Sequence, residues 1–334
     1  MRRWRQAMAA ALYGPDGFFT RPGNAPAHHF RTSVLASAWF TEAVTRLVLR
    51  LDTALGHPDP LVVMDIGAGR GELLTGLAAR TPAGLSDRLR LVAVERAARP
   101  DQLPERIEWR STPLSRLTGL VLATEWLDNV PVEVAEVDPA GVARYQLVDP
   151  VTGGEQPGPP VTGPDADWLA RWWPLTAPGQ RAEIGRTRDE AWAAAVATVT
   201  HGAALAVDYG HTRSHRPQGG TLTGFRAGRQ VPPVPDGHCD LTAHVAIDAV
   251  AVAGEVAATG GAAAITLTQR EALARLGLTG ARPPLAQAGA DPAGYLTALA
   301  AASQIAELTD PAGLGSHYWL LQPVGIDPMA LWQA

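Results

Sequence analysis

The sequence predicts an α/β domain built on a mostly parallel sheet, and one stretch carries most of that prediction. The run LVVMDI at 61–66 is unbroken and aliphatic, as expected of a strand buried on both faces. A turn with Gly67, Gly69 and Gly71 follows, where missing Cβ atoms let a ligand approach the backbone. A helix is expected directly after it, starting at Glu72. Further strands are expected at 89–94, 107–110, 120–123, 203–208, 262–268 and 317–323.

The part before the first strand, residues 1–58, is expected to be an N-terminal loop and helical segment. A helix over 1–12 should stop at the turn cluster YGPDG, residues 13–17. A loop rich in aromatic and histidine residues follows, and Ser33 is a plausible cap for a second helix that reaches residue 55. Residues 59–334 are then expected to form the sheet domain.

An insertion at 150–200 is expected to interrupt that domain. A hairpin precedes it at 132–148, and the Pro- and Gly-rich segment 149–165 has the composition of a surface loop. Residues 166–200 are predicted to be helical and carry Trp168, Trp172, Trp173 and Trp192. Two interpretations stay open: a lid or partner surface, and an aromatic cluster that packs on the core.

Composition argues against several classes of protein. The net charge of −5 and the absence of a basic stripe argue against a nucleic-acid partner. The single cysteine, Cys239, rules out an intramolecular disulfide and a multi-cysteine zinc site, and no metal is expected. No apolar run reaches the roughly 18 residues of a membrane span, and the basic N-terminus is too short in its apolar part for a signal peptide. We therefore expect a cytoplasmic protein.

The glycine turn is compatible with two kinds of nucleotide site. A dinucleotide fingerprint, G-x-G-x-x-G, needs its third glycine at position 72, but Glu72 stands there and the glycine is Gly71. A carboxylate beside a pyrophosphate is also unfavourable. The observed pattern, Asp65 two residues before G-x-G-x-G, resembles the first motif of class I S-adenosyl-L-methionine (SAM) methyltransferases. A dinucleotide enzyme and a plain structural turn remain as alternatives.

The SAM interpretation assigns several residues to the cofactor. Asp65 would lie near the cationic methionyl end, against the turn of Gly67, Gly69 and Gly71. Glu95, at the end of the second strand, is placed to accept hydrogen bonds from ribose hydroxyls. Thr112 is expected near the adenine and Thr124 beside the cofactor at the end of the fourth strand.

Two carboxylates follow the fourth strand, Glu125 and Asp128. If the segment turns helically, both face the same side, beside a transferred methyl group. An N-cap and a first-turn acid of a helix would explain them equally simply. Further along, Asp240 is expected to cap a helix, and His244 is either a proton acceptor or a structural histidine.

The whole set of motifs resembles the MidA-type family, whose mitochondrial members assemble respiratory complex I and methylate an arginine of a partner subunit. The matching pieces are YGPxGFFT (13–20), HFxT (29–32), the Asp65 turn, Val94-Glu95, ExxDxxP (125–131), VDYG (207–210), GTL (220–222), DxTAHV (240–245) and QRE (269–271) before Leu276-Gly277. The chain departs from the family at His28-His29, at Thr124 and around Gly228-Arg229.

This resemblance implies a class I SAM methyltransferase fold: a Rossmann-like, seven-stranded, mostly parallel sheet with an N-terminal helical segment and a helical insertion. It implies a SAM-dependent methyltransferase (EC 2.1.1 class) that acts on an arginine of a protein substrate. Expected catalytic residues are Glu125, Asp128 and His244; expected substrate-binding residues are Phe30, Thr32, Asp208, Tyr209 and Asp240. A homodimer is the candidate assembly. The alternative functions are a SAM-binding assembly or interaction protein without turnover and a small-molecule methyltransferase.

Overall fold

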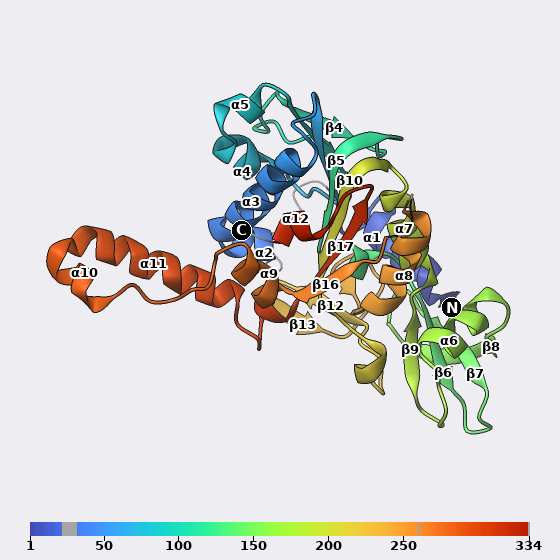
Figure 1. Cartoon of the computed structure of the whole chain (residues 1–334). Coiled ribbons are helices and arrows are strands. Elements are labelled where there is room, and N and C mark those ends of the chain that lie inside the picture. Colours follow the sequence, from blue (N-terminus) through green and yellow to red (C-terminus); the bar gives the residue numbers. More distant parts are fainter. Residues whose placement is uncertain (22–31, 259, 261, 333–334) are drawn as a thin grey trace.

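A computed structural model of the chain describes residues 1–21, 32–258, 260 and 262–332 (Figure 1). Within these residues, seven strands form a central sheet in the order β16-β17-β10-β5-β2-β3-β4. The strands are β2 (Leu61–Ile66), β3 (Leu89–Val94), β4 (Ile107–Arg110), β5 (Leu117–Thr124), β10 (Val199–Asp208), β16 (Ile265–Thr268) and β17 (Tyr318–Val324). The pairs from β10 to β4 are parallel, whereas β17 runs antiparallel to both β10 and β16. The predicted α/β class is confirmed, with a mixed sheet.

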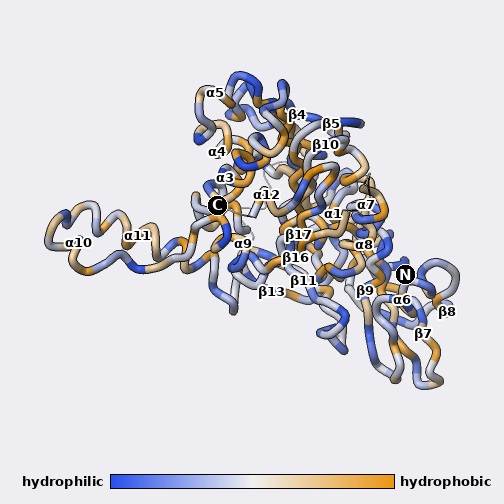
Figure 2. Tube along the Cα trace, viewed as in Figure 1, coloured by the Kyte–Doolittle hydropathy of each residue, from blue (hydrophilic) through white to orange (hydrophobic). Residues whose placement is uncertain are grey.

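Helices cover both faces of this sheet, which explains why its central strands β2, β5 and β10 are largely apolar. The side chains of β2 alternate: Leu61 and Val63 join one core, and Val62 and Met64 join the other. The first core is closed by α3 (Ala38–Ala54), α4 (Glu72–Arg80), α9 (Gln269–Arg275) and α12 (Met329–Trp332). The second is closed by α7 (Arg186–Val196) and α8 (Ile247–Ala257). In Figure 2 the hydrophobic residues gather along the central strands and the helices beside them.

A second sheet joins the N-terminus to the insertion. Its strands are β1 (Arg2–Arg3), β6 (Glu133–Val137), β7 (Ala143–Val148), β8 (Glu155–Pro160) and β9 (Arg181–Ile184), in the order β1-β7-β6-β9 with β8 also paired to β7. Helix α1 (Trp4–Tyr13) packs on this sheet, and α6 (Pro164–Trp172) lies next to β9.

Two sequence predictions about this region are wrong. The stretch 155–160, expected as loop because of its prolines and glycine, is strand β8; its exposed position on β7 leaves room for residues that a central strand excludes. The stretch 166–200 is not all helix, because β9 separates α6 from α7. Four residues are too few to show a period of two in the sequence.

Two shorter sheets complete the fold beyond the insertion. Strand β12 (Thr223–Arg226) pairs with β13 (Arg229–Val231) and β14 (Asp240–Thr242), and β11 (Gly210–His211) pairs with β15 (Val245–Ala246). Asp240 therefore begins a strand and does not cap α8, which starts at Ile247. The helix expected over 33–55 is also divided: Thr32 caps α2 (Ser33–Ala36), and the extended Ser37 caps α3.

A helical arm, α10 (Leu285–Ala290) and α11 (Pro292–Leu308), projects from the body on the left of Figure 1. Only Ala302, Ile305 and Leu308 of α11 are buried, at the end where the arm meets the body. Elsewhere on the arm Leu296 leaves 65% of its surface exposed. Among the described helices, none combines the length and apolar character that crossing a membrane requires.

The contrast between sheet and arm gives a stability prediction. Leu122→Ala, at a fully buried position of β5, should lower the free energy of unfolding by about 2–5 kcal/mol, because it removes methyl groups and leaves a cavity. Leu296→Ala makes the same chemical change on the arm and should cost less than about 0.5 kcal/mol. Urea unfolding of the three proteins measures both values; equal losses would contradict the packing described here.

Candidate functional site

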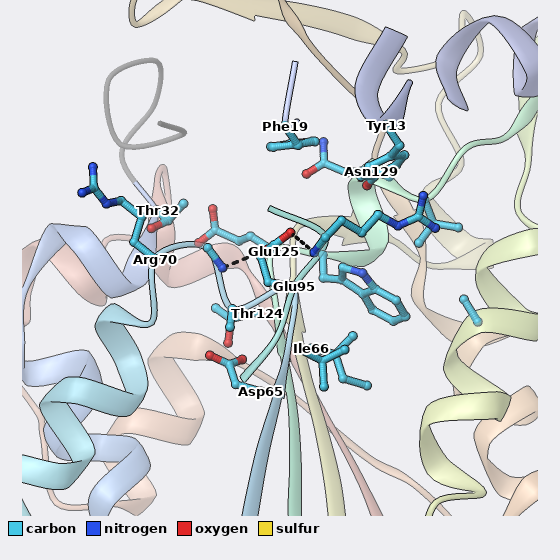
Figure 3. Close-up of a pocket in the computed structure, with 18 of the residues that line it drawn as sticks. Tyr13, Phe19, Thr32, Asp65, Ile66, Arg70, Glu95, Thr124, Glu125 and Asn129 are labelled. Atoms are coloured by element: carbon cyan, nitrogen blue, oxygen red, sulfur yellow. Dashed lines mark hydrogen bonds between the residues drawn. The ribbon is translucent and has the colours of Figure 1, made fainter. Parts of the chain in front are cut away.

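A cavity of about 680 Å³ opens at the carboxyl ends of β2, β3 and β5 (Figure 3). The glycine turn and the segment after β5 form its walls, together with residues of α1 and α2. Its lining includes Ala10, Tyr13, Phe19, Thr32, Leu35, Asp65, Gly67, Gly69, Arg70, Glu95, Ser111, Thr124, Glu125, Trp126 and Asn129. A cavity of this size suits a ligand of nucleotide or drug-like dimensions.

The glycine turn has the backbone shape that its sequence predicts. Gly67, Gly69 and Gly71 have φ values of +73°, +58° and +81°, in the left-handed region. A Cβ on Gly67 would come within 2.7 Å of the Trp126 ring, and one on Gly71 within 2.5 Å of Leu103. Close packing, as well as conformation, therefore requires glycine at 67 and 71. Gly71 begins α4 and does not line the cavity.

Three acids surround this turn. The Glu95 carboxylate accepts hydrogen bonds from the backbone N–H of Gly69 at 3.1 Å and of Arg96 at 2.6 Å, which fixes the turn to the end of β3. Burial, and then the charges of Glu72 and Glu95, raise the pKa of Asp65 to about 8. A cationic group bound here would favour the ionised form of Asp65 and offset the repulsion from Glu72 and Glu95, so this end of the cavity fits an ammonium or sulfonium ligand.

The other predicted cofactor residues are divided. Thr124 lines the cavity, at the end of β5. Thr112 does not, although its neighbours Ser111 and Pro113 do. The guanidinium of Arg96 lies over the Tyr13 ring, 4.7 Å from its centroid, and joins α1 to this side of the cavity.

Glu125 lies at the turning point between β5 and the 3-10 helix η2 (Leu127–Asn129). Its φ of +48° is unusual for a residue with a side chain, and its N–H donates to the carbonyl of Val207 at 2.7 Å. The side chain is 8% exposed and accepts a 2.7 Å hydrogen bond from the Ser33 N–H. Burial raises the pKa of Glu125 to about 7, with a further contribution from Asp128. The site thus holds a carboxyl group that ionises near neutrality.

Asp128 has different surroundings from Glu125 and does not line the cavity. It is 3% exposed, and its Oδ2 accepts hydrogen bonds from the hydroxyls of Tyr209 and Thr242. Its Oδ1 has no hydrogen-bond partner among the described residues. Burial raises the pKa of this carboxyl group as well. Because a 3-10 turn replaces the expected helical one, the two acids have separate neighbours.

Asp208 and Arg188 hold this segment in place. The Asp208 carboxylate is fully buried at the end of β10 and accepts hydrogen bonds from the N–H groups of Leu127 at 2.9 Å and Asp128 at 3.2 Å. The buried guanidinium of Arg188, on α7, donates to the carbonyls of Asp128, Val130, Ala243 and His244. These bonds join η2 to residues 243–244, which connect β14 to β15.

The remaining predicted residues lie behind or beside the cavity. Asp240 is 2% exposed and accepts a 2.9 Å hydrogen bond from the side chain of Asn129. His244 is exposed, and its ring meets that of Tyr209 edge to face at 5.2 Å. Thr32 lines the cavity and caps α2. Phe30 lies outside the described residues.

The sequence reasoning missed several residues of the site. The Trp126 ring packs against Gly67 of the glycine turn, and the Ser33 N–H donates to the Glu125 carboxylate. The Nδ1 atom of His317 lies 3.9 Å from Glu125 Oε1. Tyr13 and Phe19 belong to a motif that the sequence does single out, but His317 has no local signal. Among the described residues, no group of three or more His, Cys, Asp or Glu side chains is arranged to hold a metal ion.

Asp65 gives the site a pH-dependent stability. Its pKa is raised in the folded state, so its stabilising contribution is complete below its ordinary value of about 4 and is lost as pH rises toward 8. We expect Asp65→Asn to be more stable, relative to wild type, at about pH 8 than at about pH 5. Urea unfolding at both pH values tests this. Asp101→Asn, which removes an exposed carboxylate, is the control, and equal behaviour of the two variants would contradict the prediction.

Two solved structures share the overall fold of this chain. A COG1565 superfamily member from Burkholderia thailandensis, solved with S-adenosylhomocysteine bound, is 25% identical, with a TM-score of 0.78 over 97% of this chain and 88% of that chain. A native structure of a COG1565 superfamily protein from the same organism is 24% identical, with a TM-score of 0.77 over 99% and 90% of the two chains. No curated protein matches the chain.

A family model settles the classification. The model described as "Putative S-adenosyl-L-methionine-dependent methyltransferase" matches residues 43–263. This range includes the glycine turn, the acids after β3 and β5, and strands β14 and β15. The cofactor implied by the family is SAM, which agrees with the glycine turn and the acid cluster at Asp65. The chain therefore belongs to this family of SAM-dependent methyltransferases.

Proposed function

We propose that the protein methylates a nitrogen of a protein side chain, and specifically an arginine, as its resemblance to the MidA-type family implies. The observation that carries this proposal is the buried carboxyl group of Glu125, which lines the same cavity as the glycine turn. A guanidinium is a planar cation that pairs well with a carboxylate.

The proposed cofactor contacts follow from the lining of the cavity. Asp65 and the turn at Gly67 and Gly69 would hold the methionyl part, and Glu95 and Thr124 the ribose and its surroundings. Gly71 and Thr112 do not line the cavity and would act indirectly. Gly71 would shape the glycine turn, and Thr112 would shape the side of the cavity near the adenine. Bound there, SAM supplies a methyl group on a positively charged sulfur. The strand order, with one reversed strand next to β10, supports the class I methyltransferase interpretation.

The proposed acceptor side has one residue at the cavity and several that position it. Glu125 would contact the acceptor nitrogen. Asp128 would orient the Tyr209 hydroxyl, and Asp208 would hold the backbone of Leu127 and Asp128, just after Glu125. Asp240 would act through Asn129, and Thr32 and His244 would flank the acceptor. The work of such a site is alignment and exclusion of water, which rigid buried supports favour.

A second candidate function is a SAM-binding assembly protein without turnover. Thr124 favours it, because this cavity residue stands where the MidA-type family usually has asparagine. The two functions differ in one observable, transfer of a labelled methyl group to protein.

Glu125→Gln should lower the rate of protein methylation by about 100-fold or more, because the amide can neither pair with a cation nor accept its proton. SAM affinity should stay unchanged, since Glu125 belongs to the acceptor side. Purified enzyme, methyl-labelled SAM and protein extract from the source cells give the rate, and amino-acid analysis for methylarginine identifies the product. Glu108→Gln, on β4, is the control. Undiminished labelling by the Glu125 variant would refute the assignment.

Gly67→Ala should weaken SAM binding by about tenfold or more, because its new Cβ would displace Trp126 from the turn. Gly56→Ala is the matched control: its φ is +69°, but nothing lies within 4 Å of the added atom. Both variants pay the strain of a left-handed alanine, and only the first should change SAM affinity. Isothermal titration with SAM measures this; equal affinities in the two variants would argue against a cofactor at the turn.

A further inference from the structure

His317 lies next to Glu125, outside the residues that line the cavity, and comes from a distant part of the chain. It follows the 3-10 helix η4 (Leu314–Ser316) and directly precedes β17. Its carbonyl accepts a 2.7 Å hydrogen bond from the N–H of Gln269, and its side chain is 10% exposed. The ring is therefore held by elements that take no part in the glycine turn.

The Nδ1 atom of His317 is buried and has no hydrogen-bond partner among the described residues. A buried polar atom without a partner is costly, and such atoms in native structures call for an explanation. The nearest carboxylate atom is Glu125 Oε1, at 3.9 Å, which is too long for a direct hydrogen bond. The Tyr209 ring, 5.5 Å from the imidazole centroid to centroid, packs beside this gap.

The charges of the two groups argue against an ion pair across the gap. Burial, and then His244, lower the pKa of His317 to about 4, whereas burial raises that of Glu125 to about 7. The imidazole is thus neutral at neutral pH, and with its proton on Nε2 it presents a lone pair at Nδ1. The titratable groups around it are Glu125, Tyr209 and His244. Nδ1 and Glu125 Oε1 thus face one another as acceptors, and although Oε1 already accepts from the Ser33 N–H, a donor placed between them would give Nδ1 a partner.

We propose that His317 Nδ1 and Glu125 Oε1 together hold the acceptor nitrogen, as two hydrogen-bond acceptors for a single N–H-bearing cation. A nitrogen about 2.9 Å from each atom would hydrogen-bond to both, given their separation of 3.9 Å. An acceptor with a proton-free nucleophile, such as a thioether, would leave Nδ1 unpaired. This inference rests on the proposed methyl transfer and adds His317 to the residues that hold its acceptor nitrogen.

The same pair disposes of the proton that methylation displaces. The acceptor nitrogen forms a bond to the methyl carbon as the carbon–sulfur bond breaks, and that electron pair stays on the sulfur of the sulfonium donor. The guanidinium keeps its single positive charge and loses one N–H proton, which passes to the Glu125 carboxylate or to His317 Nδ1. Both are placed to receive it without crossing the cofactor side of the cavity.

The test uses the intact protein with S-adenosylhomocysteine and two small cations, methylguanidine and methylamine. Nitrogen NMR of the histidine rings should show a shift at His317 Nδ1 when either cation is added to the S-adenosylhomocysteine complex. His317→Phe keeps the ring volume and removes the acceptor, and should weaken cation binding by about tenfold. His317→Asn, whose amide oxygen can replace Nδ1 as an acceptor, should recover part of it. His201→Phe, at the amino end of β10, is the control.

The outcomes separate this inference from the proposed function. If wild type does not bind S-adenosylhomocysteine in a calorimetric titration, the proposed function fails and the inference with it. If it does bind, the inference alone is overturned when neither cation shifts His317 or when His317→Phe binds the cations as wild type does. Should His317→Phe lose S-adenosylhomocysteine binding, the wild-type shift and the asparagine variant decide the question in the same way.

Discussion

The buried pair of Asp208 and Arg188 is the constraint on which the candidate site depends. Asp208 accepts hydrogen bonds from the N–H groups at the start of η2, and Arg188 donates to the carbonyls of Asp128 in η2 and of residues 243 and 244 between β14 and β15. Neither side chain meets the other in a direct ion pair among the described contacts; each is satisfied by backbone instead. Burying two such charges is expensive unless every polar atom finds a partner. Here the backbone N–H and carbonyl groups of Leu127 and Asp128 supply these partners, which fixes the segment that follows Glu125.

Burial gives the carboxyl groups of the site distinct properties within one cavity. The pKa values of Asp65 and Glu125 are both raised above that of an exposed acid, the first by burial and two acidic neighbours, the second by burial and then by the charge of Asp128. A cation approaching either group favours ionisation. At neutral pH these two carboxyl groups therefore carry less than full charge, and a cationic ligand at one end and the proposed cationic acceptor at the other would favour the ionisation of both.

The sequence predicts the parts of the fold whose determinants are local. A few neighbouring residues are enough to predict the apolar strand at 61–66, the three-glycine turn and the acid at Glu95. The structure has all three in the expected places. The sequence does not predict β8 and β9, because pairing with β7 and β6, and not their composition, makes these segments strands. The separate surroundings of Glu125 and Asp128 depend on a left-handed φ at Glu125. His317 lies close to Glu125 although 192 positions separate them in the sequence. No periodic pattern in the sequence predicts either feature.

The position of β17 also has a consequence for how the molecule is assembled. This strand lies between β10 and β16, yet residues 318–324 follow every other strand of the sheet along the chain. During synthesis, β10 must wait with an open edge until β17 emerges, and open edges invite pairing with other chains. His317 arrives at the same moment, immediately before β17. A nascent chain can thus form its glycine turn early, but it completes the acceptor side only when the sheet closes.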